Sequence, residues 1–296
     1  MSVIELTNLT RRYGRFTAVA ELSLAVRAGS LFGFLGPNGA GKTTTIQVLM
    51  GLLRASAGGA YINGRDAWRD STRLKREVGF LPGDFRFYPY ATGHEALRLV
   101  GRLRRQDLTG AGQTLAERYD LDLSVRSGKM SRGMRQKLGI ILALAHRPKL
   151  LILDEPTAGL DPLMQQALLG HLRELAATGV TVFFSSHTLS EVEQLCSEIA
   201  ILRKGRLVVC EALEKLRERA ERQVTITWRD AAQAGSVEPP PMLAVDERIG
   251  VLWRGRLTGP SPELLRWLSQ QQPLDVTIGE PRLDALFQRF YREEEQ

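Results

Sequence analysis

The chain of 296 residues is long enough for one large or two modest domains. Apolar residues make up 43% of it and charged residues 25%, which is ordinary for a globular protein with a hydrophobic core. The net charge of +7 is compatible with nucleic acid, an anionic membrane surface or nucleotide phosphates as partners, and it does not choose between them.

Cysteine content and hydropathy exclude further classes of protein. Cys196 and Cys210 lack the spacing of a zinc site or a disulfide framework, so both are expected to be small core residues in a reducing, cytosolic setting. Residues 1–10 do not have the pattern of a signal peptide. The longest apolar stretch in a helical context, residues 138–145, is far shorter than the ~20 residues of a membrane span. A soluble protein is predicted, and any membrane location requires a partner.

The first third of the chain predicts short strands and one helix. Alternating apolar and polar residues indicate strands over 3–9, 20–26, 30–35, 58–63 and 78–81. A glycine-rich turn over 36–41 is expected to open a helix over 42–53.

The middle of the chain has the pattern of an α/β protein with a helical insertion. Apolar residues at helical spacing predict helices over 94–105, 113–119 and 132–145. A continuous apolar run over 150–153 predicts a strand that is buried on both faces. Helices and strands then alternate, over 162–177, 180–184, 189–196 and 199–202. This alternation indicates a mostly parallel sheet, with the helical subdomain over about 84–147.

The pattern changes after a charged helix expected over 211–222. Strands are predicted over 224–228, 251–257 and 274–278, and helices over 262–271 and 283–292. Three consecutive prolines within 235–241 indicate an extended connection. We therefore expect two domains, 1–217 and a small α+β accessory domain over 218–296.

The glycine-rich turn matches a phosphate-binding loop at every fixed position and lies between a strand and a helix. Glycines let backbone N–H groups turn toward phosphates, and the helix N-terminus adds its positive dipole. Lys42 is expected to reach the β- and γ-phosphates, and the hydroxyl of Thr43 to bind Mg²⁺. The predicted nucleotide-binding residues are Gly36, Pro37, Asn38, Gly39, Ala40, Gly41, Lys42, Thr43 and Thr44.

Two carboxylates follow the buried strand over 150–153. Asp154 is placed to hold Mg²⁺, and Glu155 to accept a proton from an attacking water molecule. The alternative is an acidic pair at a strand end beside a helix N-terminus. With the phosphate-binding loop upstream, we predict the second half of a nucleotide site.

These motifs together resemble the nucleotide-binding subunit of ABC transporters. Leu153-Asp-Glu-Pro-Thr157 is followed by Gly159-Leu-Asp-Pro162, in the order of that family, and the resemblance covers about residues 4–216. It implies the fold class: an α/β P-loop NTPase cassette with a mixed sheet and a helical insertion. It also implies that the chain is an ATPase with ATP and Mg²⁺ as cofactors.

The resemblance assigns roles to further residues. Tyr13 matches the aromatic residue that stacks on adenine, and His187 the residue that contacts the γ-phosphate. Ser131 and Gly133 lie in the family signature, and Asp161 in the loop that communicates across a dimer. Each residue type also has a simpler interpretation. Tyr13 could end a strand, His187 could be a core residue, and Ser131 could cap a helix, a role compatible with phosphate binding.

Two positions depart from the family pattern. Arg132 replaces a glycine of the signature, and it could point away or offer a charge to the phosphates. Gly83 replaces a glutamine that touches the metal ion, and the neighbouring Asp84 could take over that contact. Similar variation occurs among exporters of the drug- and antibiotic-resistance type, whose C-terminal appendage ends in a motif like Leu283-Asp-Ala-Leu-Phe287.

The implied function is ATP-driven transport, with export favoured, through separate membrane permease subunits at the cytoplasmic face of the membrane. Two cassettes would close head to tail, as a homodimer or with a related chain. The alternatives are a soluble nucleotide-switched factor and a subunit that hydrolyses ATP poorly. Because arginines and aromatic residues do not alternate as in single-strand binders, no nucleic acid partner is expected. The arginines of residues 102–105 are expected on a solvated or membrane-proximal helix face.

Overall fold

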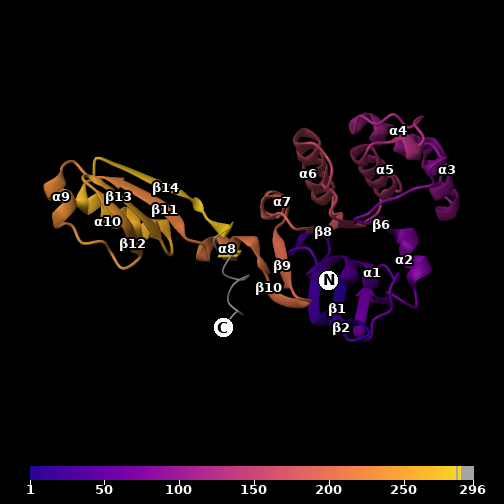
Figure 1. Ribbon diagram of the computed structural model, residues 1–296, viewed down its shortest axis with the longest axis horizontal. Coiled ribbons are helices and arrows are strands. Elements are labelled where there is room, and N and C mark those ends of the chain that lie inside the picture. The colour runs from indigo at the N-terminus through magenta and orange to yellow at the C-terminus, as the bar shows by residue number, and fades with distance from the viewer. Residues whose placement is uncertain (285, 288–296) are drawn as a thin grey trace. The chain divides into compact units, whose positions relative to one another are not determined.

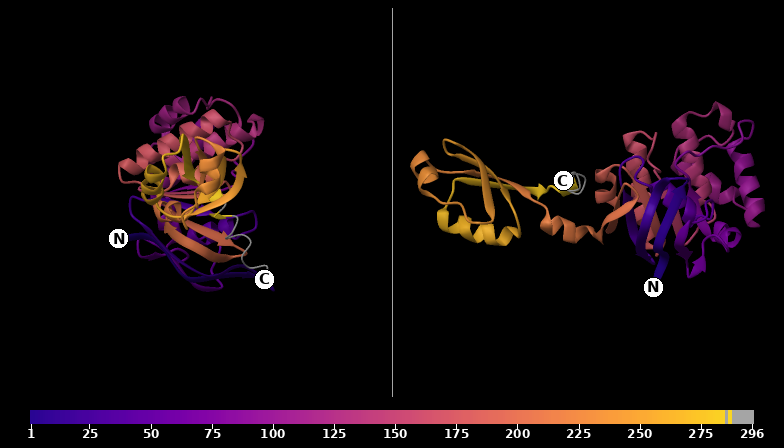
Figure 2. Two further views of the ribbon diagram at one scale, coloured as in Figure 1. Left: turned by 90° about the vertical axis from the view of Figure 1, so that its left-hand side faces the viewer. Right: turned by 60° about the horizontal axis from the view of Figure 1, so that its bottom comes forward.

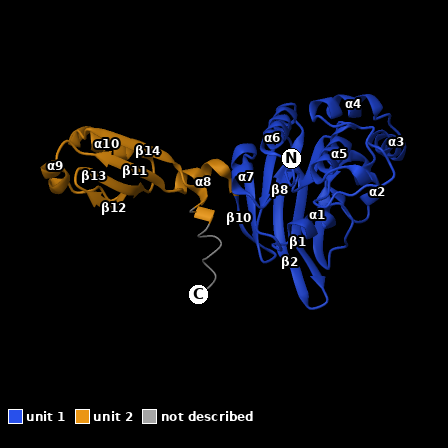
Figure 3. Cartoon of the chain, turned by 45° about the horizontal axis from the view of Figure 1, so that its top comes forward, with its two compact units in different colours: residues 1–210 blue, residues 211–296 orange. Residues whose placement is uncertain are grey.

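The computed structural model of the chain describes residues 1–284, 286 and 287. It divides into two compact units, residues 1–210 and 211–296 (Figure 3). The charged helix predicted over 211–222 is shorter than expected and forms α8 (Leu213–Arg219). The residues before it form strand β10 (Arg206–Ala212), because they follow β9 (Glu198–Arg203) through the turn at Lys204 and Gly205 and join the same sheet.

The first unit is built on a sheet of six strands in the order β10-β9-β3-β8-β7-β6. The central strands are β3 (Leu31–Leu35), β8 (Thr181–Ser186), β7 (Leu150–Asp154) and β6 (Val78–Leu81). The strands from β9 to β6 run parallel. Every residue of β7 is buried, as expected of an apolar strand covered on both faces. Parallel strands end at the same edge, which brings together the segments that follow β3, β7 and β8.

A second, antiparallel sheet has the order β2-β1-β4-β5. Its strands are β1 (Ser2–Tyr13), β2 (Phe16–Arg27), β4 (Ala57–Ile62) and β5 (Arg65–Asp66). Helix α1 (Lys42–Leu49) contributes Ile46 and Leu49 to the core that it shares with both sheets. The prediction that α1 extends to residue 53 is wrong, because Gly51 adopts a φ of 57° and ends the helix in a left-handed turn.

Helices α3 (Gly93–Arg104), α4 (Thr109–Arg118) and α5 (Arg132–Leu144) lie together as the predicted insertion (Figure 1). Thr92 and Glu95 form a capping box at the start of α3, and Ser131 caps α5. Helices α6 (Pro162–Ala177) and α7 (Leu189–Leu195) connect the later strands. The short helix α2 (Ser71–Glu77) and the 3₁₀ turn Ser127–Lys129 were not predicted.

The second unit contains an antiparallel sheet in the order β12-β13-β11-β14. Its strands are β11 (Arg222–Thr227), β12 (Leu243–Ile249), β13 (Leu252–Leu257) and β14 (Asp275–Pro281). Helix α10 (Ser261–Gln271) runs along one face of this sheet (Figure 2), and α9 (Ala231–Ser236) follows β11. Strand β12 and helix α9 were missed, because β12 is mostly exposed and has three consecutive charged residues at 246–248, and α9 has only six residues.

The predicted closing helix and the motif at 283–287 fall only partly on the residues that the structure describes. Leu283, Asp284, Leu286 and Phe287 are helical, whereas Ala285 and the rest of that prediction lie outside the described residues. No helix among the described residues is both long and apolar enough to span a membrane. The predicted α/β architecture with a helical insertion is confirmed.

Candidate functional site

The loop between β3 and α1 has a backbone that requires glycine. Gly39 and Gly41 adopt φ angles of 81° and 104°. A Cβ atom on Gly41 would lie 2.5 Å from the carbonyl oxygen of Ala18, and one on Gly36 would lie 2.5 Å from that of Leu202. Residues 37–39 are exposed at the loop tip, directly before the N-terminus of α1. This geometry suits an anion held by backbone N–H groups and the helix dipole.

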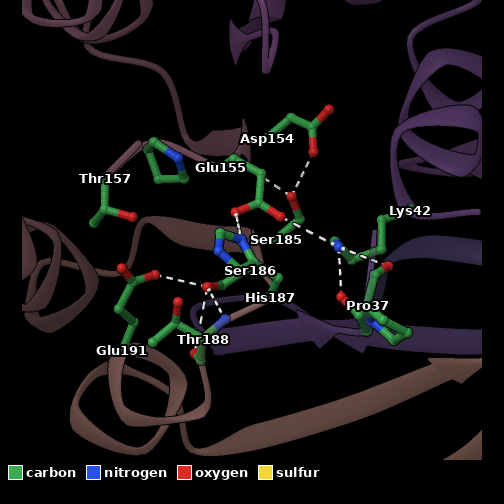
Figure 4. Close-up of polar contacts among 12 residues, drawn as sticks. Pro37, Lys42, Asp154, Glu155, Thr157, Ser185, Ser186, His187, Thr188 and Glu191 are labelled. Atoms are coloured by element: carbon green, nitrogen blue, oxygen red, sulfur yellow. Dashed lines mark hydrogen bonds and ion pairs between the residues drawn. The ribbon is translucent and has the colours of Figure 1, made fainter. Parts of the chain in front are cut away.

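Lys42 begins α1 and turns back into the loop (Figure 4). Its side chain is 5% exposed, and Nζ donates hydrogen bonds to the carbonyl oxygens of Gly36 at 2.5 Å and Pro37 at 3.4 Å. Nζ also lies 3.2 Å from Glu155 Oε1. The ammonium group is therefore fixed inside the loop by carbonyl oxygens and one carboxylate.

Glu155 links Lys42 to His187. Its Oε2 atom lies 2.7 Å from His187 Nδ1, so the carboxylate bridges an ammonium and an imidazole. Oε1 is buried and, among the described residues, has no hydrogen bond of its own beside the ion pair with Lys42. That oxygen retains acceptor capacity for a proton.

Asp154 ends β7 with 1% of its surface exposed. Oδ1 accepts a hydrogen bond of 2.5 Å from Ser185 Oγ, and a Cβ atom on Gly83 would lie 3.1 Å from Oδ2. The described residues contain no group of three or more His, Cys, Asp or Glu side chains that could hold a metal ion. Mg²⁺ needs only one or two protein oxygens when phosphates and water complete its shell, and a carboxylate such as that of Asp154 is a ligand of the type that this ion prefers.

A hydroxyl and carboxylate cluster supports the segment after β8. Ser186 Oγ donates to Glu191 Oε2 at 2.6 Å and accepts from the Thr188 N–H at 2.8 Å (Figure 4). The side chain of His187 between them remains 54% exposed. Sequence reasoning missed Ser185, Ser186 and Glu191. The available signal was two hydroxyl residues at the end of an otherwise apolar strand.

The other predicted residues lie apart from this group. No hydrogen bond or ion pair in the described part of the chain joins Tyr13, Ser131 or Asp161 to Lys42, Glu155 or His187.

Each of these residues has a local partner instead. The ring of Tyr13 lies 4.6 Å from the Arg11 guanidinium and is 43% exposed. Ser131 Oγ accepts from the Met134 N–H at 3.1 Å, and Asp161 Oδ1 from the Met164 N–H at 3.0 Å, so both cap helices. Gly133 lies close to the backbone of Gly159, because a Cβ atom on Gly133 would lie 2.8 Å from the Gly159 carbonyl oxygen.

The two departures from the family pattern have distinct environments. Asp84 is 78% exposed and forms an ion pair of 2.9 Å with Arg86, so its carboxylate faces solvent and not Asp154. Arg132 packs against Gly159, where a Cβ atom would lie 3.1 Å from Arg132 Cδ. Arg132 also lines a cavity of about 580 Å³ together with Gly83, Phe85 and Arg135.

Comparison with known proteins identifies the family. The sequence model of the ABC transporter family matches residues 19–158. The uncharacterized ABC transporter ATP-binding protein YhcH of Bacillus subtilis is 38% identical over 210 residues, which cover 70% of this chain and 69% of that protein. The bacitracin transport ATP-binding protein BcrA of Bacillus licheniformis is 35% identical over 238 residues, 79% of this chain and 77% of that protein.

A solved structure has the same fold. The ATP-binding subunit of an ABC transporter superimposes with a TM-score of 0.69 at 30% identity, over 73% of this chain and 92% of that chain. The chain therefore belongs to the ATP-binding subunits of ABC transporters, a family of ATPases.

Proposed function

We propose that this subunit binds Mg²⁺–ATP in the loop of residues 36–44 and hydrolyses it with Glu155 as general base. The observation that carries the proposal is the position of the Glu155 carboxylate, which lies between Lys42 and His187. The glycine loop supplies N–H groups for the phosphates, and Lys42 places its charge at the β- and γ-phosphates. Thr43 and Thr44 stand at the start of α1, and Tyr13 is available for adenine.

Hydrolysis would proceed by attack of water on the γ-phosphate. Glu155 Oε1 accepts the proton of that water, while Lys42 offsets the negative charge that develops on the phosphate oxygens. His187 holds the other carboxylate oxygen through Nδ1 and so fixes the direction of the carboxylate. Magnesium held by Asp154 and Thr43 would neutralise phosphate charge when bound.

A single chain supplies only part of this site. Within the described part of the chain, no hydrogen bond or ion pair joins Ser131 or Asp161 to Lys42, Glu155 or His187, and Ser131 stands at the N-terminus of α5. A helix N-terminus with a serine hydroxyl is suited to bind phosphate. We infer that these residues serve the nucleotide held by a second cassette, either another copy or a related chain.

The transport partner is inferred from the family. Because the chain belongs to the ATP-binding subunits of ABC transporters, translocation would use separate permease subunits, and the chain would act at the cytoplasmic face of the membrane as a peripheral subunit. Export is favoured because a linearmycin resistance ATP-binding protein, LnrL of Bacillus subtilis, is among the relatives, and resistance is consistent with removal of the antibiotic from the cell. We further propose residues 218–296 as an accessory domain of the cassette.

Affinity purification of the full chain from solubilised membranes tests the partner. The expected result is co-purification with one or two polytopic proteins and ATPase activity in that complex. Recovery without any polytopic protein, together with co-sedimentation with ribosomes, would favour a soluble nucleotide-switched factor instead.

A further inference from the structure

The backbone of Glu155 adopts a conformation that its side chain does not favour. Its φ angle is 49°, in the left-handed region that residues other than glycine rarely occupy. Such a conformation persists only where surrounding contacts fix it, and it recurs at functional sites. The contacts that fix it here come from two different elements, β8 and α5.

Ser185 fixes the N-terminal side of Glu155 from β8. It is fully buried, and both its carbonyl oxygen at 3.2 Å and its Oγ at 3.1 Å accept hydrogen bonds from the Glu155 N–H. The same Oγ donates to Asp154 Oδ1 at 2.5 Å. One hydroxyl therefore orients the side chain of Asp154 and the main chain of Glu155 together.

Gln136 fixes the C-terminal side of Glu155 from α5. Its side chain is buried, and Nε2 donates to the carbonyl oxygens of Glu155 at 3.1 Å and Pro156 at 3.0 Å. Gln136 belongs to the same helix that Ser131 caps. A shift of α5 therefore acts on the backbone of Glu155 directly through the side chain of Gln136.

We propose that Gln136 and Ser185 are positioning residues that clamp Glu155 from opposite sides, so that the position of α5 sets the direction of the Glu155 carboxylate. This inference rests on the proposed role of Glu155 as general base. When a nucleotide on a second cassette engages Ser131, α5 moves as one helix and Gln136 transmits that movement to the base. The clamp thus makes hydrolysis depend on the position of helix α5.

The test uses the near-isosteric variant Gln136→Met, which keeps the volume of the side chain and removes its donor, and Ser185→Ala. The full chain is assayed for ATP turnover, and its affinity for a non-hydrolysable Mg²⁺–ATP analogue is measured by calorimetry. We expect kcat to fall about 10- to 100-fold in both variants, as misplacement of a catalytic group by about 1 Å does. The Kd of the analogue should stay within about twofold of wild type in Gln136→Met, since the side-chain hydrogen bonds of Gln136 go to Glu155 and Pro156 and not to residues 36–44.

Thr181→Val is the matched control. Thr181 is a buried hydroxyl residue on the same strand as Ser185, and it accepts a hydrogen bond from the Gly29 N–H at the opposite end. This variant should lose stability while kcat stays near wild type. Ser185→Ala should in addition raise the Mg²⁺ concentration needed for half-maximal turnover, because Asp154 loses its donor, and Gln136→Met should not.

A double variant separates this inference from the proposed function. If Gln136 acts through Glu155, Gln136→Met lowers kcat in wild type but has little further effect in the Glu155→Gln background. A full additional loss in that background, or a wild-type kcat in Gln136→Met alone, would overturn the clamp. A wild-type kcat in Glu155→Gln alone would instead overturn the proposed role of Glu155.

Discussion

The edge of the parallel sheet in the first unit and the sheet of the second unit are stabilised in different ways. At the edge, Lys42, Asp154 and Ser185 are buried: Lys42 Nζ donates to the Gly36 carbonyl oxygen, and Ser185 Oγ donates to Asp154 Oδ1. In the second unit, Trp228 and Trp253 are fully buried at a centroid distance of 4.9 Å with an interplanar angle of 72°, and their indole N–H groups have no partner among the described residues. Its charged pairs are exposed, such as Arg254 with Glu247.

The difference separates specificity from bulk stability. A buried polar network is strongly disturbed when one partner is removed, because the remaining group stays unpaired. A cluster of aromatic rings contributes mainly through buried area and packing. Substitutions at the sheet edge should therefore affect chemistry first, and those in the second unit should affect folding first.

The largest effect is expected for Glu155→Gln. Loss of the proton acceptor should lower kcat by about 10²–10⁴, the usual contribution of a general base, with ATP still bound. Steady-state phosphate release measures the loss, and Glu117→Gln on the exposed face of α4 is the matched control, expected to keep wild-type turnover. Turnover near wild type in Glu155→Gln would remove Glu155 from the chemistry.

Trp228→Ala tests the second region. Removal of this buried indole should destabilise the second unit by about 3–5 kcal/mol, since a large cavity opens between the sheet and α10. Thermal unfolding followed by near-UV circular dichroism measures the change. Trp68→Ala, in a side chain that is 46% exposed, should lose far less stability. Equal losses would show that the aromatic cluster does not stabilise the second unit.

His146 offers a pH test in the first unit, away from the sheet edge. Burial lowers its pKa to about 4, and the nearby Arg104 adds to that shift while the backbone of Val78 opposes it. The unfolded chain therefore binds a proton that the folded chain rejects between about pH 6.5 and 4. The free energy of unfolding therefore carries this contribution in full above the pKa that His146 has in the unfolded chain. The contribution is lost as pH falls, by about 2 kcal/mol between pH 7 and 5.

Urea unfolding of wild type and His146→Gln at both pH values measures this contribution. The variant should lose less stability than wild type on acidification. Burial also lowers the pKa of His171, so some dependence should persist in the variant. Equal pH dependence in the two proteins would show that His146 is not the group responsible.

The smallest effect is expected for Arg254→Gln. The ion pair with Glu247 has a separation of 3.4 Å, and its two side chains are 60% and 50% exposed. Exposed pairs contribute about 0.2–1 kcal/mol, and salt screens them. Differential scanning calorimetry at low and high salt should detect only a small shift of the unfolding temperature, and a loss comparable to that of Trp228→Ala would contradict this ranking.

The fold of the first unit was largely predictable, because its signals are local and strong. The apolar run before Asp154 indicates a buried strand, and the glycine loop before Lys42 indicates a turn that leads into a helix. Strands β1 and β2 extend beyond the predicted ranges. They pair with each other, and this pairing keeps residues extended whose own sequence pattern does not predict a strand. Strand β12 has a mostly polar exposed face and could not be distinguished from a loop.

The chemistry of the site was predictable only where residues belong to a motif. Lys42, Asp154 and Glu155 stand at fixed positions in their motifs. Ser185 belongs to no motif, and Gln136 ends the signature stretch 131–136, but both act through contacts with residues 30 and 19 positions away. A single sequence does not reveal which hydroxyl or amide will meet a given backbone group. The left-handed backbone of Glu155 likewise depends on those tertiary contacts.

Calorimetric titration of a non-hydrolysable Mg²⁺–ATP analogue into the full chain and into Lys42→Ala tests the central claim most directly. If phosphates bind between the glycine loop and the Lys42 ammonium, the variant should lose at least about 100-fold in affinity, since a charge-assisted contact to triphosphate is removed. Equal affinity in the two proteins would contradict the assignment of residues 36–44 as the nucleotide site.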